Sequence, residues 1–215
     1  MSTRSDLRKA WIVTRPGERV AGCGIEAYRG TVILVCIHGP PGVGKLSVGR
    51  QLERMTGYIL VHDHLVIETA AVVFPFGEDG FSNLRSQLFA DLLHAACSTR
   101  RGILLTHAND IFWNPTFETL LRNSVGRFGY AVRRVFLHCD EEEHARRISD
   151  PRRAQYRKIR EIERLRDLTA AGEFSAPPIL RGDLVIDTTE ISATETAAQI
   201  AFSLALTDQV IRKVS

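Results

Sequence analysis

The sequence predicts an α/β domain in which five parallel strands form one sheet with helices on both faces. Short apolar runs alternate with helix-like segments along the chain, and the run at residues 31–38 is apolar from Val32 to Ile37, without polar alternation. Continuous apolar runs are typical of strands that are buried on both faces of a sheet. Alternation with helices favours parallel pairing, because each crossover helix returns the chain to the same end of the sheet.

The expected elements follow in order along the chain. Strands are expected at residues 31–38, 58–62, 102–107, 131–139 and 183–188. Helices are expected at residues 46–57, 65–73, 82–100, 115–129, from 141 onward, and 192–206. Gly57 is expected to end the first helix, and Ser82 to cap the third after a loop at residues 74–81, FPFGEDGF. Residues 1–30 have weak periodicity and several glycines, so we interpret them as a peripheral or flexible extension of a domain that spans residues 31–215.

The composition is that of a globular protein with room for one domain and a small inserted lid. Of its 215 residues, 44% are hydrophobic and 25% are charged. The formal net charge of +3 is too small to predict nucleic acid or a membrane as the main partner. No apolar stretch approaches the roughly 20 residues that span a bilayer, and no apolar segment follows the N-terminal arginines. We therefore expect a cytoplasmic protein.

The four cysteines do not form a recognisable metal-binding or disulfide pattern. Cys23, Cys36, Cys97 and Cys139 show no C-x-x-C spacing. Cys36 and Cys139 lie in apolar, strand-like runs, which predicts buried free thiols in a reducing compartment.

A glycine-rich turn, HGPPGVGKLSVGR, joins the first expected strand to the first helix. Its glycines allow successive backbone N–H groups to point into one concavity, where the N-terminus of the following helix favours an anion. Lys45 adds a positive charge for the β- and γ-phosphates of a nucleotide. The alternative is a turn that only connects strand to helix. The predicted phosphate site consists of Gly39, Pro40, Pro41, Gly42, Val43, Gly44, Lys45, Leu46 and Ser47.

The residue after Lys45 is Leu46, and the hydroxyl of Ser47 follows one position later. In this spacing the loop resembles that of adenylate kinases. Residues 31–206 resemble the small-molecule and nucleoside-phosphate kinase branch of the P-loop NTPases, which includes shikimate kinase and chloramphenicol phosphotransferase. The segment VIDTTEISATETAAQI is similar to the last strand, loop and helix of these kinases. The resemblance implies a three-layer sandwich with strand order 2-3-1-4-5, bound ATP and Mg²⁺, and a short arginine-rich lid at about residues 146–172.

The segment HDHLVIE, residues 62–68, follows the second expected strand, where the resembling kinases bind their acceptor. Chloramphenicol phosphotransferases, which the chain also resembles, carry a single aspartate near this strand end. The resemblance implies that Asp63 is the base, or the orienting group, for a substrate hydroxyl. His62 and His64 occupy two positions that are acidic in shikimate kinases, which counts against shikimate as the substrate. Because they are two residues apart, we expect both to face one side of an extended strand end, where they contact substrate or cap the strand. A third ligand at metal-binding spacing is missing from the neighbouring sequence.

The third expected strand is followed by THAND, where the resemblance implies contacts to substrate or magnesium. His107 and Asn109 are candidates for substrate binding, and Asp110 is the candidate indirect partner of Mg²⁺, together with Ser47. An Asn-Asp pair that caps a loop is the alternative interpretation. Arg85 is a further candidate for acceptor binding, against the default of a surface arginine.

Arginines gather after the fourth expected strand. By their order along the chain, Arg147 and Arg152 or Arg153 correspond to the lid arginines that contact the transferring phosphates in the resembling kinases. A planar guanidinium suits bidentate contact with phosphate, and lid closure excludes water. From Arg157 onward, glutamates at i, i+4 spacing indicate a solvated helix instead.

Two functions are compatible with these residues. The first is a kinase that transfers the γ-phosphoryl group of Mg-ATP to a hydroxyl or phosphate of a small molecule, with Lys45, Asp63 and the lid arginines as catalytic residues. The second is a nucleotide-binding switch or interaction protein with slow or no ATPase activity, because the third expected strand, GILLTH, does not end in aspartate and His62 and His64 stand where acids are expected. We expect a small-molecule acceptor as partner, no nucleic acid or membrane, and a monomer or homodimer.

Overall fold

The computed structural model describes residues 32–76, 78–106, 123, 125–151, 163, 166–167, 170 and 183–206. Five strands form one sheet in the order β2-β3-β1-β4-β5, and the four pairs of neighbouring strands are all parallel. The predicted fold class and strand order are therefore confirmed. The predicted extension at residues 1–30 and most of the predicted lid lie outside the described residues.

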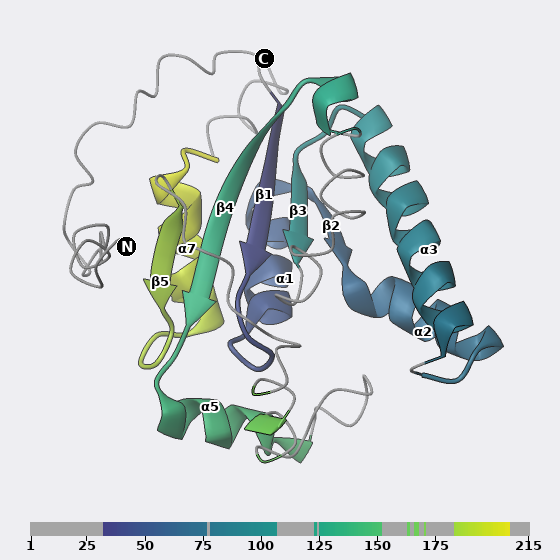
Figure 1. Cartoon of the computed structure of the whole chain (residues 1–215). Helices are drawn as coiled ribbons and strands as arrows, with labels where there is room; N and C mark the ends of the chain where they lie inside the picture. Colours follow the sequence, from purple (N-terminus) through teal and green to yellow (C-terminus); the bar gives the residue numbers. More distant parts are fainter. Residues whose placement is uncertain are drawn as a thin grey trace, which may run out of the picture.

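The elements follow the expected alternation (Figure 1). The strands are β1 (Val32–His38), β2 (Ile59–His62), β3 (Ile103–Thr106), β4 (Tyr130–His138) and β5 (Leu184–Asp187). The helices are α1 (Lys45–Thr56), α2 (Asp63–Val73), α3 (Asp79–Ser98), α5 (Glu141–Ile148) and α7 (Ala193–Ser203). Of the helix expected at residues 115–129, only its last part falls within the described residues.

Two hydrophobic layers enclose the central strand β1. Ile33, Val35 and Ile37 pack on one face with residues of α1 and α7. Leu34 and Cys36 point to the opposite face, into a cluster that includes residues of α3. This alternation follows from the two-residue period of a strand, and it requires apolar residues at every position of β1. The result is a three-layer sandwich with α1 and α7 together on one side of the sheet (Figure 1).

The carboxyl ends of the strands share one edge of the sheet. There His38 of β1 pairs with Phe136 of β4, and His62 of β2 pairs with Thr106 of β3. The loop after β1 and helix α5 lie at this edge, at the bottom of Figure 1.

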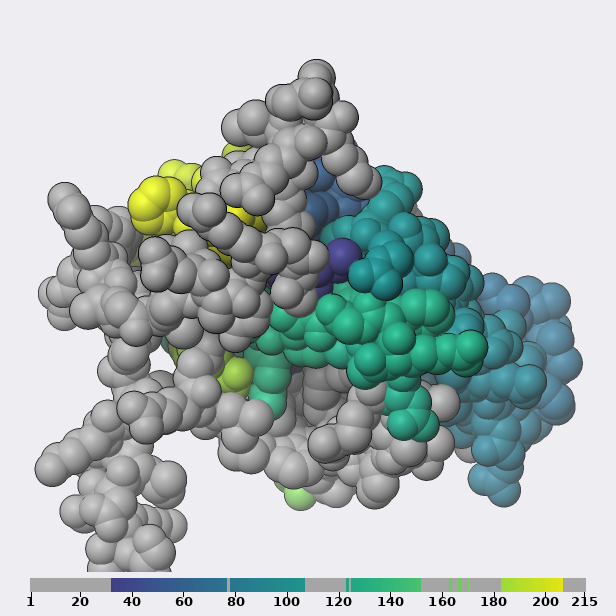
Figure 2. All heavy atoms as spheres, turned by 90° about the horizontal axis from the view of Figure 1, so that it is seen from above, coloured from purple at the N-terminus to yellow at the C-terminus, as the bar shows by residue number. Residues whose placement is uncertain are grey.

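The opposite edge is closed by contacts between the segment after α3 and the start of β4. The hydroxyl of Tyr130 donates a hydrogen bond to the carbonyl of Arg101 at 2.7 Å. In the view onto this edge, the residues that lead into β4 lie against those of α3 (Figure 2). Because Tyr130 is anchored at the first position of β4, the register of β4 beside β1 is fixed from this end.

Both predicted signals for helix ends can be compared with the structure. The prediction for α1 is confirmed: Gly57 adopts a left-handed conformation, and its N–H donates to the carbonyl of Glu53 at 2.8 Å. The prediction for Ser82 is wrong, because α3 already begins at Asp79, and the N–H of Ser82 donates to the carbonyl of Glu78. Gly80 suggested a loop, but it lies inside the helix, where a Cβ atom would come within 2.7 Å of the Phe74 ring.

The burial of the cysteines agrees only partly with the prediction. Cys36 is a fully buried free thiol, and burial raises its pKa. Cys139, however, follows the last residue of β4 and is only partly buried. Among the described residues, no helix is both long and apolar enough to cross a membrane.

Leu104, in β3, is fully buried. We expect Leu104→Ala to lower the free energy of unfolding by about 2–5 kcal/mol, because it removes buried methyl groups and leaves a cavity. Val72→Ala is the control: this side chain is 84% exposed, and its loss should cost at most about 0.5 kcal/mol. Urea unfolding followed by circular dichroism measures both, and equal losses would contradict the assigned core.

Candidate functional site

The loop between β1 and α1 owes its shape to three glycines. Gly39, Gly42 and Gly44 have φ angles of 140°, 101° and 95°, in the region that residues with a side chain rarely adopt. A Cβ atom on Gly39 would lie 2.2 Å from the carbonyl oxygen of Leu137 in β4. The loop can therefore leave β1 in tight contact with β4 only if residue 39 is glycine.

Helix α1 points its N-terminus at this loop. The preceding residue, Gly44, has no side chain that could accept hydrogen bonds from the first turn. The first helical hydrogen bond runs from the N–H of Val48 to the carbonyl of Gly44, at 3.0 Å. The positive end of the helix dipole and the N–H groups of the first turn are thus directed to the loop, which favours an anion there.

Lys45 and Ser47 lie in the first turn of α1. The ammonium group of Lys45 donates to the carbonyls of Gly39 and Pro40 at 2.7 and 2.8 Å, so it lies over the start of the loop. Ser47 is exposed, whereas Leu46 is partly buried. The order G-K-L-S therefore places the hydroxyl, and not the leucine, at the surface of the helix.

Helix α5 packs directly against the loop. The Nε2 atom of His144 lies 2.5 Å from the carbonyl oxygen of Pro41. A Cβ atom on Gly42 would come within 2.8 Å of Ile148 and 3.1 Å of the His144 ring. The close fit of α5 is thus a second reason, besides the φ angle, for glycine at position 42.

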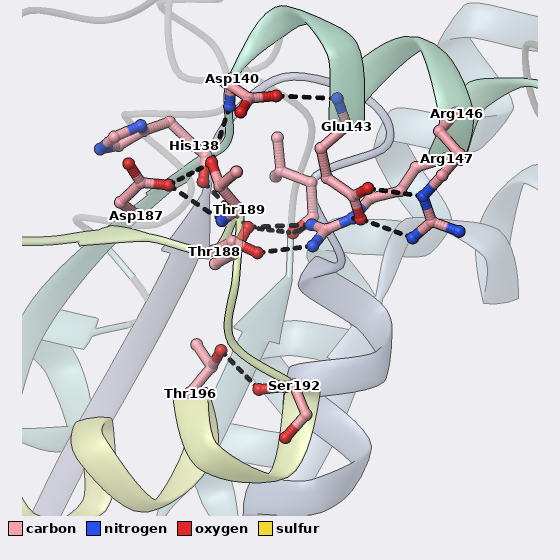
Figure 3. Close-up of polar contacts among 11 residues, drawn as sticks. His138, Asp140, Glu143, Arg146, Arg147, Asp187, Thr188, Thr189, Ser192 and Thr196 are labelled. Atoms are coloured by element: carbon pink, nitrogen blue, oxygen red, sulfur yellow. Dashed lines mark hydrogen bonds and ion pairs between the residues drawn. The ribbon is translucent and has the colours of Figure 1, made fainter.

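Arg147 lies in α5 and reaches from that helix to the loop and to the end of β5 (Figure 3). Its Nη1 atom donates to Thr188 Oγ1 at 2.9 Å and to the carbonyl of Val43 at 3.4 Å. Its Nη2 atom donates to the carbonyl of Thr188 at 2.5 Å. Of the three predicted lid arginines, the structure thus places Arg147 beside the phosphate loop, while Arg152 and Arg153 lie outside the described residues.

Glu143 holds two arginines on α5. Its carboxylate accepts hydrogen bonds from Arg146 at 2.5 and 2.6 Å and from Arg147 at 2.6 Å. The hydrogen bonds from Arg146, followed by those from Arg147, lower the pKa of Glu143 to about 2. Its backbone N–H is capped by Asp140, so the carboxylate is also fixed at the first turn of the helix.

Two turns at the carboxyl edge are tied together. The hydroxyl of Thr189 donates to Asp187 at 2.6 Å and accepts from the N–H of Asp140 at 2.9 Å (Figure 3). With the bonds from Arg147 to Thr188, these contacts join the segment after β4 to the segment after β5. Glu143, His144 and Thr188 were not predicted as site residues, although the i, i+3 spacing of His144 and Arg147 places both on one face of α5.

The acceptor side differs from the sequence-based expectation in one respect. Helix α2 begins at Asp63, with His62 as the last residue of β2. His62 and His64 therefore do not share an extended strand end, and the reason given for their proximity is wrong. Their rings nevertheless lie 6.0 Å apart, because the first turn of the helix brings His64 back toward the strand. Asp63 lies between them, and its Oδ1 atom is buried.

Arg85 is partly buried rather than fully exposed. It lies one helical turn from Phe81 and one from Phe89, both almost fully buried, and thus on the face of α3 that packs on the core. Its Nε atom is buried and has no hydrogen-bond partner among the described residues. Burial of an unsatisfied donor is costly, so the Nε atom of Arg85 calls for a structural or functional explanation.

Histidines end three of the five strands: His38 on β1, His62 on β2 and His138 on β4. His38 is fully buried directly before the phosphate loop, and its ring contacts that of Phe136, with centroids 5.2 Å apart. Phe136 in turn stacks with His138 at 6.1 Å. Of these three, only His62 was predicted as a site residue. The position of His38 at the end of the first expected strand was a comparable signal, whereas the fourth strand was expected to continue to Cys139.

The remaining predicted site residues, His107, Asn109 and Asp110, lie outside the described residues. Within the part of the chain that the structure describes, no group of three or more His, Cys, Asp or Glu side chains is arranged to hold a metal ion.

Solved structures share this architecture. The APS kinase of Mycobacterium tuberculosis, in complex with AMPPNP and APS, matches with a TM-score of 0.55 at 16% identity, over 81% of this chain and 98% of its own. A gluconokinase from Sinorhizobium meliloti matches with the same TM-score and identity, over 87% of this chain and all of its own. The chain has the fold of the P-loop small-molecule kinases. The resemblance inferred from the loop is therefore confirmed.

Curated sequences with detectable similarity also include a P-loop kinase. A shikimate kinase from Corynebacterium efficiens is 29% identical over 142 residues, which cover 59% of this chain and 82% of that enzyme. A nucleotide-binding protein from Mannheimia succiniciproducens is 30% identical over 168 residues, or 78% of this chain, but the match spans only about half of that protein, 51%. No protein-family model matches the chain.

The low pKa of Glu143 predicts how the free energy of unfolding changes at acid pH. The folded-state pKa of about 2 lies below the ordinary value of 4.5, so the carboxylate stabilises the fold above pH 4.5. This stability is lost as the pH falls from 4.5 to 2. We expect Glu143→Gln to lower the unfolding free energy at neutral pH and to flatten its decline over this interval.

Glu142→Gln is the matched control, because Glu142 is an exposed neighbour in the same first turn of α5. Urea unfolding at a series of pH values measures both variants. Identical pH profiles for the two would show that the pairing with Arg146 and Arg147 is not the source of the acid sensitivity.

Proposed function

We propose that the protein is a kinase that transfers the γ-phosphoryl group of Mg-ATP to a small-molecule acceptor. The observation that carries this proposal is the loop from Gly39 to Lys45, with its three left-handed glycines next to the N-terminus of α1. This geometry directs backbone N–H groups at an anion, and Lys45 adds the charge that phosphoryl transfer requires. The similarity to shikimate kinase, gluconokinase and APS kinase supports the same class of reaction.

Magnesium fits this site as a cation held largely by the phosphates. Mg²⁺ usually keeps several waters and is bound by one or two protein groups together with phosphate oxygens. The hydroxyl of Ser47, exposed in the first turn of α1, is the group we propose on the protein side. Asp110, as an indirect partner, remains part of the proposal on the basis of the sequence alone.

The acceptor is proposed to bind beside Asp63. Asp63 is the first residue of α2, where the helix dipole favours a negative charge. It lies at the carboxyl edge of the sheet, where the phosphate loop also lies. In the proposed reaction Asp63 orients the acceptor hydroxyl and takes its proton as the phosphoryl group transfers. Lys45 stabilises the charge on the transferring group, while His62 and His64 contact the acceptor.

Arg85 indicates the kind of acceptor. A guanidinium on the buried face of α3, with a buried Nε atom, suits a carboxylate or phosphate that reaches it from the acceptor side. We therefore propose an acceptor that carries both a hydroxyl and an anionic group. Arg147 is proposed to act on the phosphate side, and Arg152, Arg153, His107 and Asn109 remain candidates from the sequence.

Nucleotide binding tests the first part of the proposal. Mg-ATP at roughly 100 times its Kd should raise the Tm of the wild type by about 5–10 °C. Lys45→Ala should remove this shift, because it removes the charge over the phosphate loop. Arg54→Ala is the control, since Arg54 is an exposed cation in the last turn of the same helix. Scanning fluorimetry measures the shifts, and a wild type that ATP does not stabilise would refute nucleotide binding.

Turnover tests the acceptor side. With Mg-ATP and a panel of hydroxy acids, phosphorylated polyols and neutral polyols, anionic acceptors should stimulate ADP release most. Asp63→Asn should lower kcat by about 10²- to 10⁴-fold, because a proton acceptor is lost. Arg85→Gln should mainly raise the KM of the acceptor, by roughly ten- to a hundredfold, because a charged hydrogen bond is lost.

Gln87→Ala, at an exposed site of the same helix, is the control for Arg85→Gln. Equal turnover of neutral and anionic acceptors would contradict the role of Arg85. ATP binding without stimulation by any acceptor would favour a nucleotide-binding switch over a kinase.

A further inference from the structure

We infer that His144, Arg147 and Thr188 are positioning residues that hold the phosphate loop in its binding conformation from outside. The inference deepens the proposed function, since it concerns how the same loop is prepared for a nucleotide. It rests on hydrogen bonds from His144 and Arg147 to two carbonyl groups of the loop, and on the contact by which Thr188 holds Arg147.

The contact of His144 is the shortest of these. Its Nε2 atom lies 2.5 Å from the carbonyl oxygen of Pro41, which can only accept a hydrogen bond. Nε2 must therefore carry the proton. The ring also lies where a side chain on Gly42 would be, so His144 holds the loop by packing and by a hydrogen bond at once.

Arg147 and Thr188 lie near the carbonyl of Val43, two residues after Pro41. Both Arg147 Nη1 and Thr188 Oγ1 lie 3.4 Å from the carbonyl oxygen of Val43. These are long contacts, but the groups that make them are well fixed. Arg147 is held by Glu143 at 2.6 Å and by Thr188 at 2.9 Å. The Thr188 hydroxyl has one proton, which it donates to the nearer carbonyl of His138 at 2.9 Å, so Thr188 acts on the Val43 carbonyl mainly by holding Arg147.

Because the peptide bond is planar, the contacts at these two carbonyl groups also set the direction of the N–H groups that follow them. The carbonyl of one residue and the N–H of the next lie in one rigid plane and point in opposite directions. When the Pro41 carbonyl is drawn to α5, the N–H of Gly42 must point away from α5. In the same way, the bonds to the Val43 carbonyl direct the N–H of Gly44.

The two prolines of the loop make the orientation of the remaining N–H groups more important for binding an anion. Pro40 and Pro41 have no N–H group, so two positions of the loop cannot donate to a phosphate. The N–H groups of Gly42 and Gly44 belong to the donors that are left between these prolines and α1. Each of them is fixed through the carbonyl in its own peptide plane.

We call His144, Arg147 and Thr188 together the clamp on the loop. In this clamp Arg147 has a role that differs from that of an arginine on a moving lid. Its guanidinium donates hydrogen bonds to Glu143, to Thr188 and to the loop carbonyl. To leave for a distant phosphate it would have to break all of them. The geometry therefore favours an arginine that stays in place and acts on the nucleotide through the loop.

Variants of His144 separate the hydrogen bond from packing. His144→Phe keeps a ring against Gly42 but has no donor, whereas His144→Gln offers an amide donor at a similar reach. Thr188→Val removes the hydroxyl at nearly constant shape. Glu142→Gln, an exposed site on α5, is the control.

The first readout uses the protein without nucleotide. In ¹H–¹⁵N spectra, we expect His144→Phe to shift the Gly42 amide signal and to increase its hydrogen exchange, and His144→Gln to restore most of both. Thr188→Val should act on the Gly44 amide instead. Signals that stay at the wild-type position in His144→Phe and in Thr188→Val would overturn the inference.

The second readout is the Kd of Mg-AMPPNP measured by calorimetry. We expect His144→Phe to weaken binding about three- to tenfold, as the loss of one positioning hydrogen bond does, and His144→Gln to recover most of it. An unchanged Kd in His144→Phe, with tight binding by the wild type, would refute a role for the clamp in binding. If the wild type does not bind Mg-AMPPNP, the proposed function fails, and the amide spectra still decide whether the clamp exists.

Discussion

The two-sided pairing of β1 is the constraint on which the rest of the site depends. Parallel neighbours on both edges and helices on both faces bury β1 from Ile33 to His38. After such an enclosed strand the chain can leave the sheet only at its carboxyl edge. There it turns within a short loop into α1. The room for that turn is set by β4, whose Leu137 carbonyl would touch any side chain at position 39. The position of the phosphate loop is thus set by the packing of β1 in the core, and its glycines allow the chain to turn there.

The features that the sequence predicted are those with local causes. β1 is recognisable because a strand buried on both faces needs apolar residues at each position, and the end of α1 because Gly57 adopts a backbone angle that few other residues tolerate. The order of the strands followed from the resemblance to P-loop kinases, whose loop spacing Lys45 and Ser47 share.

The features that the sequence did not predict depend on contacts between distant segments. Gly80 was interpreted as part of a loop, because its reason for being glycine is the ring of Phe74, which the fold brings against it. Arg85 was a candidate for acceptor binding against the default of a surface arginine, and only the packing of Phe81 and Phe89 indicates that it lies on the partly buried face of α3. The contact between His144 and Pro41 joins residues 103 positions apart, and no spacing rule connects them.

The clamp on the loop has a thermodynamic consequence. The cost in conformational entropy of ordering Pro41 to Gly44 is met when the protein folds, so a nucleotide would meet a site that is already organised. Linkage then works in both directions: if α5 improves the affinity of the loop by some factor, a bound nucleotide must protect α5 against local unfolding by the same factor. A short helix of eight residues, of little stability alone, would thus become a reporter of whether the loop beside it is occupied.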